Sequence, residues 1–414
     1  MSTASPALPP FGVVAAALRR TTEHLARELA MPGTARPDWN EFEWDVARAV
    51  AVMQGITVLL AHQLQWRGPR SWQQFLDTQH RQALQREMRI DALIVRVDAA
   101  LQDADACVVG LKGTALRALG LYRPGERPMG DIDLLTRPED RGRIDRALRS
   151  LDYVEAFATR RHIVYEPREK PTAAAHGEDP RNPLKIEIHE CIGEPLPVRC
   201  VDITHTLYPG DMRPGINPYR NDAGLMRHLL LHAAGNMRAH ALRQVQLNDI
   251  ALLGRRLGAE AWDKLLCSRD SEGGSWWMYP PLALTARYYP DSACPALAEF
   301  AAACPPVLRL AAGRETLTRV SWSNLRIHAF PGLSWSRSPL DVLRFMRQRI
   351  LPGRTALTEL DFVEVAQPAL KAVPWYGLGH SQRIVRWMVS RPPRAQTIMS
   401  LHAALEAGSP RDQP

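Results

Sequence analysis

Hydrophobic residues recur at the spacing of an α-helix over residues 11–30 and 40–100, and again from about residue 222 onward. Between about residues 104 and 190 the period changes, and short runs rich in β-branched residues alternate with helical stretches. These runs lie at 107–109, 132–135, 162–165 and 185–189. The pattern predicts an α/β (α+β) core that carries a sheet and is flanked by N-terminal and C-terminal helical regions.

A chain of 414 residues exceeds the size at which one hydrophobic core usually stops growing, so several packed units are expected. The changes in period place them at 1–103 (N-terminal helical region), 104–215 (core), 216–330 (helical domain) and 331–414 (C-terminal helical extension). Residues 1–10 and 405–414 are predicted to be disordered. The proline-containing stretch 167–183 predicts a long loop between two strands, of the kind that is often mobile or faces substrate.

Charge and cysteine usage narrow the class of protein only slightly. The net charge of +8 lies in arginine, which suits a protein that binds phosphates, although a basic surface that contacts only solvent explains it equally. The sequence contains no clear nucleic-acid-binding motif. The six cysteines show neither a C-x-x-C pair nor zinc-ligand spacing, which predicts reduced thiols. Residues 11–18 lack the features of a secretory signal and 49–61 are too short to span a bilayer, so a cytoplasmic protein is expected.

Residues 108–116 (VVGLKGTAL) have the pattern of a strand, a glycine turn and a helix that is predicted to end at Gly120. Gly113 would let a ligand approach the backbone, and the free N–H groups at the start of a helix favour an anion. Thr114 is expected either to cap the helix or to donate its hydroxyl to a phosphate, and Lys112 adds positive charge. Such a turn also occurs in proteins without a ligand.

Asp131 and Asp133 alternate with Ile132 and Leu134 on a predicted strand, so that the two carboxylates share one face. Hard divalent cations such as Mg²⁺ (or Mn²⁺) take oxygen ligands of this kind and bridge them to phosphates. Two solvated acids at the end of a strand are the alternative. The apolar neighbours favour a buried strand, in which paired acids are costly without a cation.

The residues after this strand predict how the next helix begins. Thr136 and Glu139 have the spacing of a capping box with a proline in the first turn, which predicts a helix over 138–150. The two aspartates are therefore expected near the carboxyl end of their strand.

A third carboxylate, Glu187, alternates with apolar residues on the run 185–189 and would join the two aspartates if the two strands are neighbours. In a two-metal site such an acid holds the cation that lowers the pKa of the attacking hydroxyl. His189, on the same face, either contacts substrate or forms a hydrogen bond at the sheet edge, and the second interpretation is favoured.

Segments 111–113, 121–122 and 127–135 together resemble the uncharacterised nucleotidyltransferases of the DNA polymerase beta superfamily. His162 with 164–166, and then 187–189, follow in the order shown by that family. Residues 228–232 and 249–253 resemble its helical half. The resemblance covers roughly residues 108 to 255, and 127–135 is its most specific part.

This resemblance implies a minimal nucleotidyltransferase fold with a mixed sheet, a nucleoside triphosphate as co-substrate and Mg²⁺ (or Mn²⁺) as cofactor. Asp131, Asp133 and Glu187 would be the catalytic metal ligands, and Gly113 and Thr114 would bind phosphate. Two departures stand out. The commoner phosphate turn of the superfamily has Gly-Ser or Gly-Gly at the position of Gly113–Thr114, and an aromatic residue often follows the strand histidine where this chain has Glu-Cys at 190–191.

Histidines and arginines elsewhere supply further candidates. His228 and His232 are four residues apart on a predicted helix, a spacing that can bind zinc, but a third ligand is not evident. Contact with nucleotide or an interdomain hydrogen bond is favoured, with Asp249 paired to them or to an arginine. His162 and His189 are possible substrate contacts. Arg127, Arg160 and Arg161 are candidate phosphate or substrate clamps, although surface arginines remain the alternative.

The sequence therefore predicts an enzyme, a nucleotidyltransferase. It would transfer a nucleoside monophosphate from a triphosphate to a hydroxyl-type acceptor, such as a peptide, protein, sugar or small molecule, and release pyrophosphate. Two alternatives stay open at this point: a non-catalytic nucleotide-binding or antitoxin-like regulatory module, and phosphoryl transfer from the same site. Neither the acceptor nor the preferred nucleotide follows from the sequence.

Overall fold

The computed structural model describes residues 8–159, 162–169, 177–267, 274–292, 294–352, 378–389 and 392–408. Its helices are α1 (Phe11–Ala30), α2 (Glu41–Gln54), α3 (Thr57–Gln63), α4 (Arg70–Asp103), α5 (Gly113–Ala118), α6 (Arg141–Ser150), α7 (Asp222–Ala239), α8 (Gln244–Arg256), α9 (Ala259–Cys267), α10 (Tyr279–Tyr288), α11 (Leu297–Ala303), α12 (Pro306–Ala312), α13 (Leu317–Val320), α14 (Pro339–Ile350), α17 (His380–Val389) and α18 (Ala395–Gly408). Short 3₁₀ turns cover Pro138–Asp140, Thr204–Thr206, Pro290–Ser292 and Leu333–Trp335. Its strands are β1 (Cys107–Gly110), β2 (Asp131–Thr136), β3 (Tyr153–Ala158), β4 (His162–Pro167), β5 (Lys185–His189), β6 (Gly193–Pro195), β7 (Cys200–Asp202) and β8 (Gly215–Asn217).

Six of these strands form one mixed sheet in the order β3-β4-β5-β2-β1-β8. Strands β2 and β5 run parallel, as do β1 and β8, while the other neighbours are antiparallel. Strands β6 and β7 form a separate two-stranded hairpin. The predicted mixed α/β core with helical flanks is confirmed.

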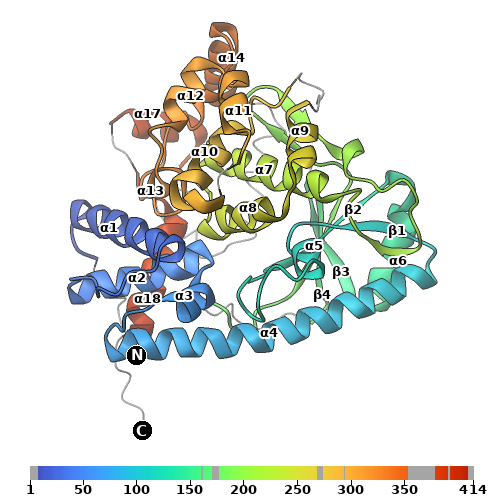
Figure 1. Cartoon of the computed structure of the whole chain (residues 1–414), viewed down its shortest axis with the longest axis horizontal. Coiled ribbons are helices and arrows are strands. Elements are labelled where there is room, and N and C mark those ends of the chain that lie inside the picture. The colour runs from blue at the N-terminus through green and yellow to red at the C-terminus, as the bar shows by residue number, and fades with distance from the viewer. Residues whose placement is uncertain are drawn as a thin grey trace.

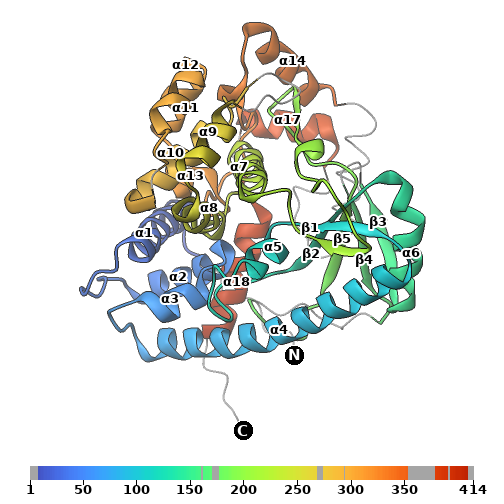
Figure 2. The same ribbon diagram turned by 45° about the vertical axis from the view of Figure 1, so that its right-hand side comes forward.

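The two faces of the sheet bury different partners. Helices α4 and α6 cover one face, where Ile132 and Leu134 of β2 pack with Val97 and Leu148. Figure 2 shows α4 running from the N-terminal helices to a position beneath the sheet. The opposite face lies toward α5 and α7, and there Leu135 of β2 joins a second core built mainly from the helices after residue 222. Since side chains alternate along a strand, Asp131 and Asp133 lie on this second face.

A third core joins helices that are far apart in the chain. Residues of α1, α2 and α3 pack with Leu401 and Ala404 of α18. Figure 1 shows the red α18 among the blue N-terminal helices. Trp39, Trp44 and Trp66 lie in the same core, with neighbouring rings at 4.8 and 6.0 Å between centroids. Helix α4 begins at this core and reaches the sheet, so it connects the two parts of the protein.

The structure corrects three local predictions. Thr136 does not cap a helix: it is the last residue of β2, its hydroxyl donates to the carbonyl of Arg137, and a 3₁₀ turn precedes α6. Because β2 begins at Asp131, the two aspartates lie at the amino end of their strand and not at its carboxyl end. Residues 405–408, predicted as part of a disordered tail, belong to α18. Part of the predicted loop (170–176) and residues 1–7 and 409–414 lie outside the described residues.

Within the described ranges, no single helix is both long and apolar enough to cross a membrane. Helices α2 and α3 pass that test only when taken together, and they meet at a bend of 113°.

A single arginine of α4 holds the chain segments that lead into β2 and β5. Arg86 is buried, and its Nε donates to the carbonyl of Met129 at 3.1 Å while Nη1 donates to that of Asn182 at 2.8 Å. Its Nη2 lies 3.4 Å from the carbonyls of Gly130 and Pro183. These two segments immediately precede the strands that carry the predicted carboxylates, so one guanidinium group ties their starting points together.

Replacement of Arg86 by methionine is expected to lower the free energy of unfolding by about 2–5 kcal/mol, because several buried carbonyl groups lose their donor. Arg86→Lys should also destabilise, since an ammonium group lacks the planar fork that reaches both segments. Urea denaturation measures both. Arg81→Lys, at an exposed position of the same helix, is the control and should change stability by less than about 0.5 kcal/mol. An Arg86→Met protein as stable as the native one would contradict the anchoring role.

Candidate active site

The parallel pairing of β2 with β5 brings the three predicted carboxylates together. Asp133 lies directly opposite Glu187, and Asp131 lies opposite Lys185. Because paired residues of neighbouring strands project from the same face, all three acidic side chains point toward α7. The condition under which Glu187 joins the two aspartates, that their strands are neighbours, is therefore met.

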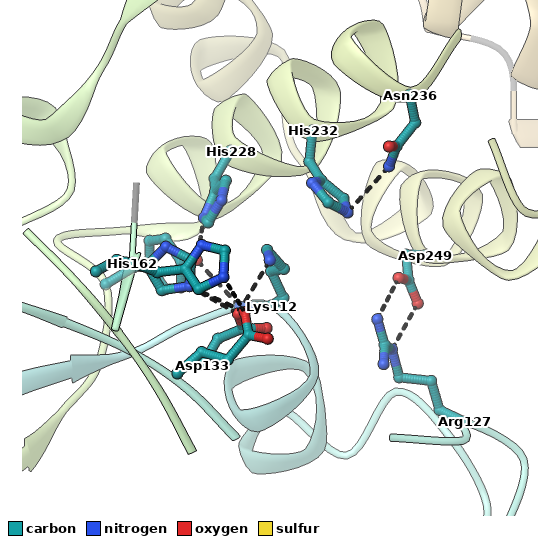
Figure 3. Close-up of polar contacts among 11 residues, drawn as sticks. Lys112, Arg127, Asp133, His162, His228, His232, Asn236 and Asp249 are labelled. Carbon is teal, nitrogen blue, oxygen red and sulfur yellow. Dashed lines mark hydrogen bonds and ion pairs between the residues drawn. The ribbon is translucent and has the colours of Figure 1, made fainter. Parts of the chain in front are cut away.

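Two side-chain nitrogen atoms lie within hydrogen-bonding distance of the Asp133 carboxylate. Lys112 Nζ lies 3.1 Å from its Oδ1, and His189 Nε2 lies 2.9 Å from the same oxygen. Burial alone would raise the pKa of Asp133, but the charge of Lys112 and the hydrogen bond from His189 hold it well below its usual range. Asp133 is therefore ionised, and Lys112 supplies the nearest positive charge (Figure 3).

The other two acids are harder to ionise. Burial raises the pKa of Asp131, and the charge of Asp133 raises it further. Burial, followed by the charges of Asp131 and Asp133, raises the pKa of Glu187 to about 8. The site thus has more negative groups than positive ones, and an additional cation would favour the ionised form of each.

The donor atoms of this cluster fit a divalent cation. Asp133, Glu187 and His189 each offer one ligand atom, and these atoms lie within 4.8 Å of one another, the one such trio among the described residues. Carboxylate oxygens are the ligands that Mg²⁺ and Mn²⁺ prefer. Asp131 lies on the same face but outside this trio, so its assignment as a metal ligand stays a prediction. For His189 a hydrogen bond at the sheet edge was favoured. Its strand β5 instead lies inside the sheet, and its ring is hydrogen-bonded to Asp133, a candidate metal ligand.

The predicted phosphate turn joins β1 to α5. Lys112 has a positive φ of 43°, and Gly113 follows as the first residue of the helix. A Cβ atom on Gly113 would lie 2.9 Å from Arg127 Nη1 and 3.0 Å from Met129, so only glycine fits here without movement. Thr114 is the second helical residue and caps nothing, which excludes the N-cap alternative. Its Oγ1 is buried without a hydrogen-bond partner in the described part of the chain.

Arg127 joins the sheet domain to α8. Its Nε and Nη2 donate to the two carboxylate oxygens of Asp249 at 3.0 and 2.8 Å, and Tyr122 donates its hydroxyl to the same carboxylate at 2.6 Å. Asp249 therefore pairs with an arginine and not with His228 or His232, as Figure 3 shows. Arg127 also lies against Gly113. Its role as a phosphate ligand stays a prediction.

A cavity of about 160 Å³ opens beside the carboxylates. It lies between the sheet, the segment that leads into the β6–β7 hairpin, and α7, and it is lined by Lys112, His162, Glu187, His189, Cys191, Ile192, Gly193, Glu194, His228, Leu231 and His232. All four predicted substrate-contacting histidines are thus on its wall. His162 Nε2 is 3.8 Å from Glu187 Oε2. In the described residues no metal-binding trio includes His228 or His232.

One residue of the site, Tyr219, carried no signal in the sequence. Tyr219 was missed: its hydroxyl accepts from the backbone N–H of Lys112 at 3.1 Å and lies 2.7 Å from His228 Nδ1. A lone tyrosine after a three-residue strand has no pattern that would identify it. Arg160 and Arg161, predicted as phosphate or substrate clamps, lie outside the described residues.

Comparison with known proteins gives the class of the chain. The sequence model of a family described as uncharacterised nucleotidyltransferases matches residues 40–287, more than half of the chain. The protein belongs to this family, which confirms the resemblance and the nucleotidyltransferase fold with helical flanks. No curated protein and no solved structure matches the sequence.

Loss of the buried ion pair should destabilise the protein. Asp249→Asn leaves the Arg127 guanidinium buried without its counter-charge and is expected to lower the free energy of unfolding by about 3–5 kcal/mol. Chemical denaturation measures this. The control is Glu260→Gln, which removes the exposed pair with Lys264 and should leave the denaturation midpoint unchanged. Equal effects of the two substitutions would contradict a structural role for the Arg127–Asp249 pair.

The raised pKa of Glu187 predicts a pH-dependent stability. A carboxyl group whose pKa rises from 4.5 to about 8 on folding binds more protons in the folded state, so its contribution to stability falls as pH rises through this range. Without divalent cations, Glu187→Gln should therefore melt roughly 2–4 °C higher than the native protein at pH 8 and show no such gain at pH 4.5.

Differential scanning fluorimetry at several pH values compares the two proteins. Addition of Mg²⁺ at pH 8 should stabilise the native protein more than Glu187→Gln, because the cation offsets the charge that the substitution has already removed. A constant difference in melting temperature across the pH range would show that Glu187 does not titrate as described.

Proposed function

We propose that this protein is a metal-dependent nucleotidyltransferase that transfers a nucleoside monophosphate from a nucleoside triphosphate to a hydroxyl-type acceptor. The observation that carries the proposal is the register of β2 and β5, which gathers Asp131, Asp133 and Glu187 on one face beside a cavity. Membership of a nucleotidyltransferase family supports the reaction type. The intact set of three acids favours an enzyme over a regulatory module that has lost its site.

Asp131, Asp133 and Glu187 would hold Mg²⁺ (or Mn²⁺), which supplies charge for the phosphates and acidity for the acceptor hydroxyl when bound. Lys112 supports this role by keeping Asp133 ionised before any cation arrives. Glycine at 113 lets Arg127 Nη1 and Met129 pack directly against the turn, and the Thr114 hydroxyl is buried beside it without a partner among the described residues. Arg127, adjacent to Gly113, is the other phosphate-binding candidate.

The proposed reaction forms a bond between the acceptor oxygen and the α-phosphorus and breaks the bond from that phosphorus to the bridging oxygen. Pyrophosphate leaves with the bridging oxygen, and the acceptor hydroxyl gives up its proton to solvent water. Because little covalent chemistry is left to the protein, its residues act mainly by positioning and by neutralising charge. The acceptor would approach through the histidine-lined cavity, since Glu187 is exposed to it. Peptides, proteins, sugars and small molecules all offer a suitable hydroxyl.

The proposal predicts that purified protein moves label from an α-³²P nucleoside triphosphate to an acceptor in a cell extract that contains Mg²⁺. Asp133→Asn and Glu187→Gln should each reduce the rate by roughly a thousandfold or more, because both remove a charge on which cation binding depends. Glu155→Gln, which changes an exposed acid on β3, is the matched control and should act like the native protein.

Product mass distinguishes the competing functions. A nucleotidyl adduct supports the proposal, whereas an adduct of one phosphoryl group, with label transferred from the γ-position, would indicate phosphoryl transfer. Metal-dependent nucleotide binding with no transfer of either label would favour a regulatory module. A protein that binds no nucleotide in the presence of Mg²⁺ would contradict all three.

A further inference from the structure

Helix α7 presents two histidine rings to the cavity beside the carboxylates. His228 and His232 are four residues apart and therefore share one face of the helix. Both line the cavity that also contains Lys112 and Glu187. Figure 3 shows the two rings on the same side of the helix, above the Lys112–Asp133 pair. One nitrogen of each ring is hydrogen-bonded to another side chain. That partner determines which of the two ring nitrogens carries the hydrogen.

The proton position on His228 follows from a chain of three groups. The backbone N–H of Lys112 donates to the Tyr219 hydroxyl oxygen at 3.1 Å, and this oxygen is 2.7 Å from His228 Nδ1. A backbone N–H is only a donor, so the Tyr219 oxygen accepts it. The Tyr219 proton then has His228 Nδ1 as its acceptor in the described part of the protein. His228 Nδ1 is therefore unprotonated, and Nε2 carries the hydrogen.

The proton of His232 lies on the other ring nitrogen. The side-chain amide nitrogen of Asn236 is 3.1 Å from His232 Nε2. An amide nitrogen is only a donor, so Nε2 accepts and Nδ1 carries the hydrogen. The two rings thus have opposite tautomers.

Both imidazoles are uncharged. Burial, and then the charge of Lys112, hold the pKa of His228 well below its usual range, and the same causes act on His232. Each ring consequently has one N–H, and that N–H has no protein acceptor among the described residues. The face of α7 that lines the cavity offers hydrogen-bond donors and no imidazole acceptor.

We propose that His228 Nε2–H and His232 Nδ1–H form a two-donor subsite for an oxyanion, that is, a phosphate or carboxylate oxygen. This inference rests on the proposed function, because it assigns a substrate group to the same cavity. An oxyanion has several lone pairs and no hydrogen to donate, so it matches the two imidazole donors. Lys112 lies on the same cavity wall, together with the carboxylates of Glu187 and Glu194. The oxyanion would belong either to the triphosphate or to a carboxylate of the acceptor.

The tautomers are tested directly in the full-length protein labelled with ¹⁵N-histidine. Two-bond ¹⁵N–¹H correlation spectra at pH 7.5 should show the Nε2–H tautomer for His228 and the Nδ1–H tautomer for His232. The variants His228→Gln and His232→Asn assign the signals. An imidazolium spectrum, or the opposite tautomer, for either residue would overturn the subsite.

The ligand class is tested by titration of the same sample with sodium tripolyphosphate in the presence of Mg²⁺ and, separately, with sodium acetate. A shift of both N–H signals by tripolyphosphate assigns the subsite to the nucleotide, and a shift by acetate alone assigns it to a carboxylate of the acceptor. Absence of any shift with either probe would overturn the proposal.

Binding measurements by calorimetry add a matched set of variants. The amide of glutamine places a donor near Nε2 and that of asparagine near Nδ1, so His228→Gln and His232→Asn should retain affinity for the effective probe within about twofold. His228→Leu and His232→Leu should each weaken it about tenfold, as expected for loss of a hydrogen bond to a charged group. Equal affinity in the native protein and both leucine variants would contradict the donor role.

Neither the spectra nor the binding measurements require turnover. A protein that transfers nucleotide but fails these tests keeps the proposed function and loses the subsite, whereas one that passes them without transferring label keeps the subsite and loses the proposed function.

Discussion

The Asp133–Glu187 register places like charges on one face of a sheet, and the electrostatic cost of doing so governs the rest of the site. Lys112 and His189 offset the charge of Asp133, but Glu187 is left with a pKa of about 8. A fold that needed only stability would replace one of these acids with an apolar residue. The retained acids are explained if a cation binds among them during function.

Long-range contacts hold this arrangement in place. Arg86, from a helix that begins in the N-terminal core, fixes the segments before both acidic strands. The buried pair of Arg127 with Asp249 holds α8 against the turn at Lys112 and Gly113. Tyr219 then connects that turn to His228 on α7. Helical regions at both ends of the core are therefore part of the framework of the site, not additions to a self-sufficient sheet.

Local pattern predicted β1, β2, β4 and β5 and two of the acids, because alternation along β2 is visible in the residues themselves, whereas β3, β8 and the β6–β7 hairpin were not predicted. The position of Glu187 depended on strand pairing, and the apolar alternation of 185–189 was enough to suggest it. The capping role of Thr136 failed because the strand extended through that residue, which also moved the aspartates to its amino end. Arg86 and Tyr219 were not predicted at all, since their partners lie 43 and 107 residues away in the chain and leave no local periodicity. The domain boundaries and the phosphate-binding roles stay predictions.

The proposed chemistry requires Asp131, Asp133 and Glu187 to bind a divalent cation together with a nucleoside triphosphate. Anomalous diffraction at the manganese edge, from crystals grown with Mn²⁺ and a non-hydrolysable triphosphate analogue, would locate such a cation. A manganese peak is expected about 2.1–2.3 Å from oxygens of these carboxylates and of the phosphates. Manganese bound elsewhere, or no manganese at this face at millimolar concentration, would contradict the proposed chemistry.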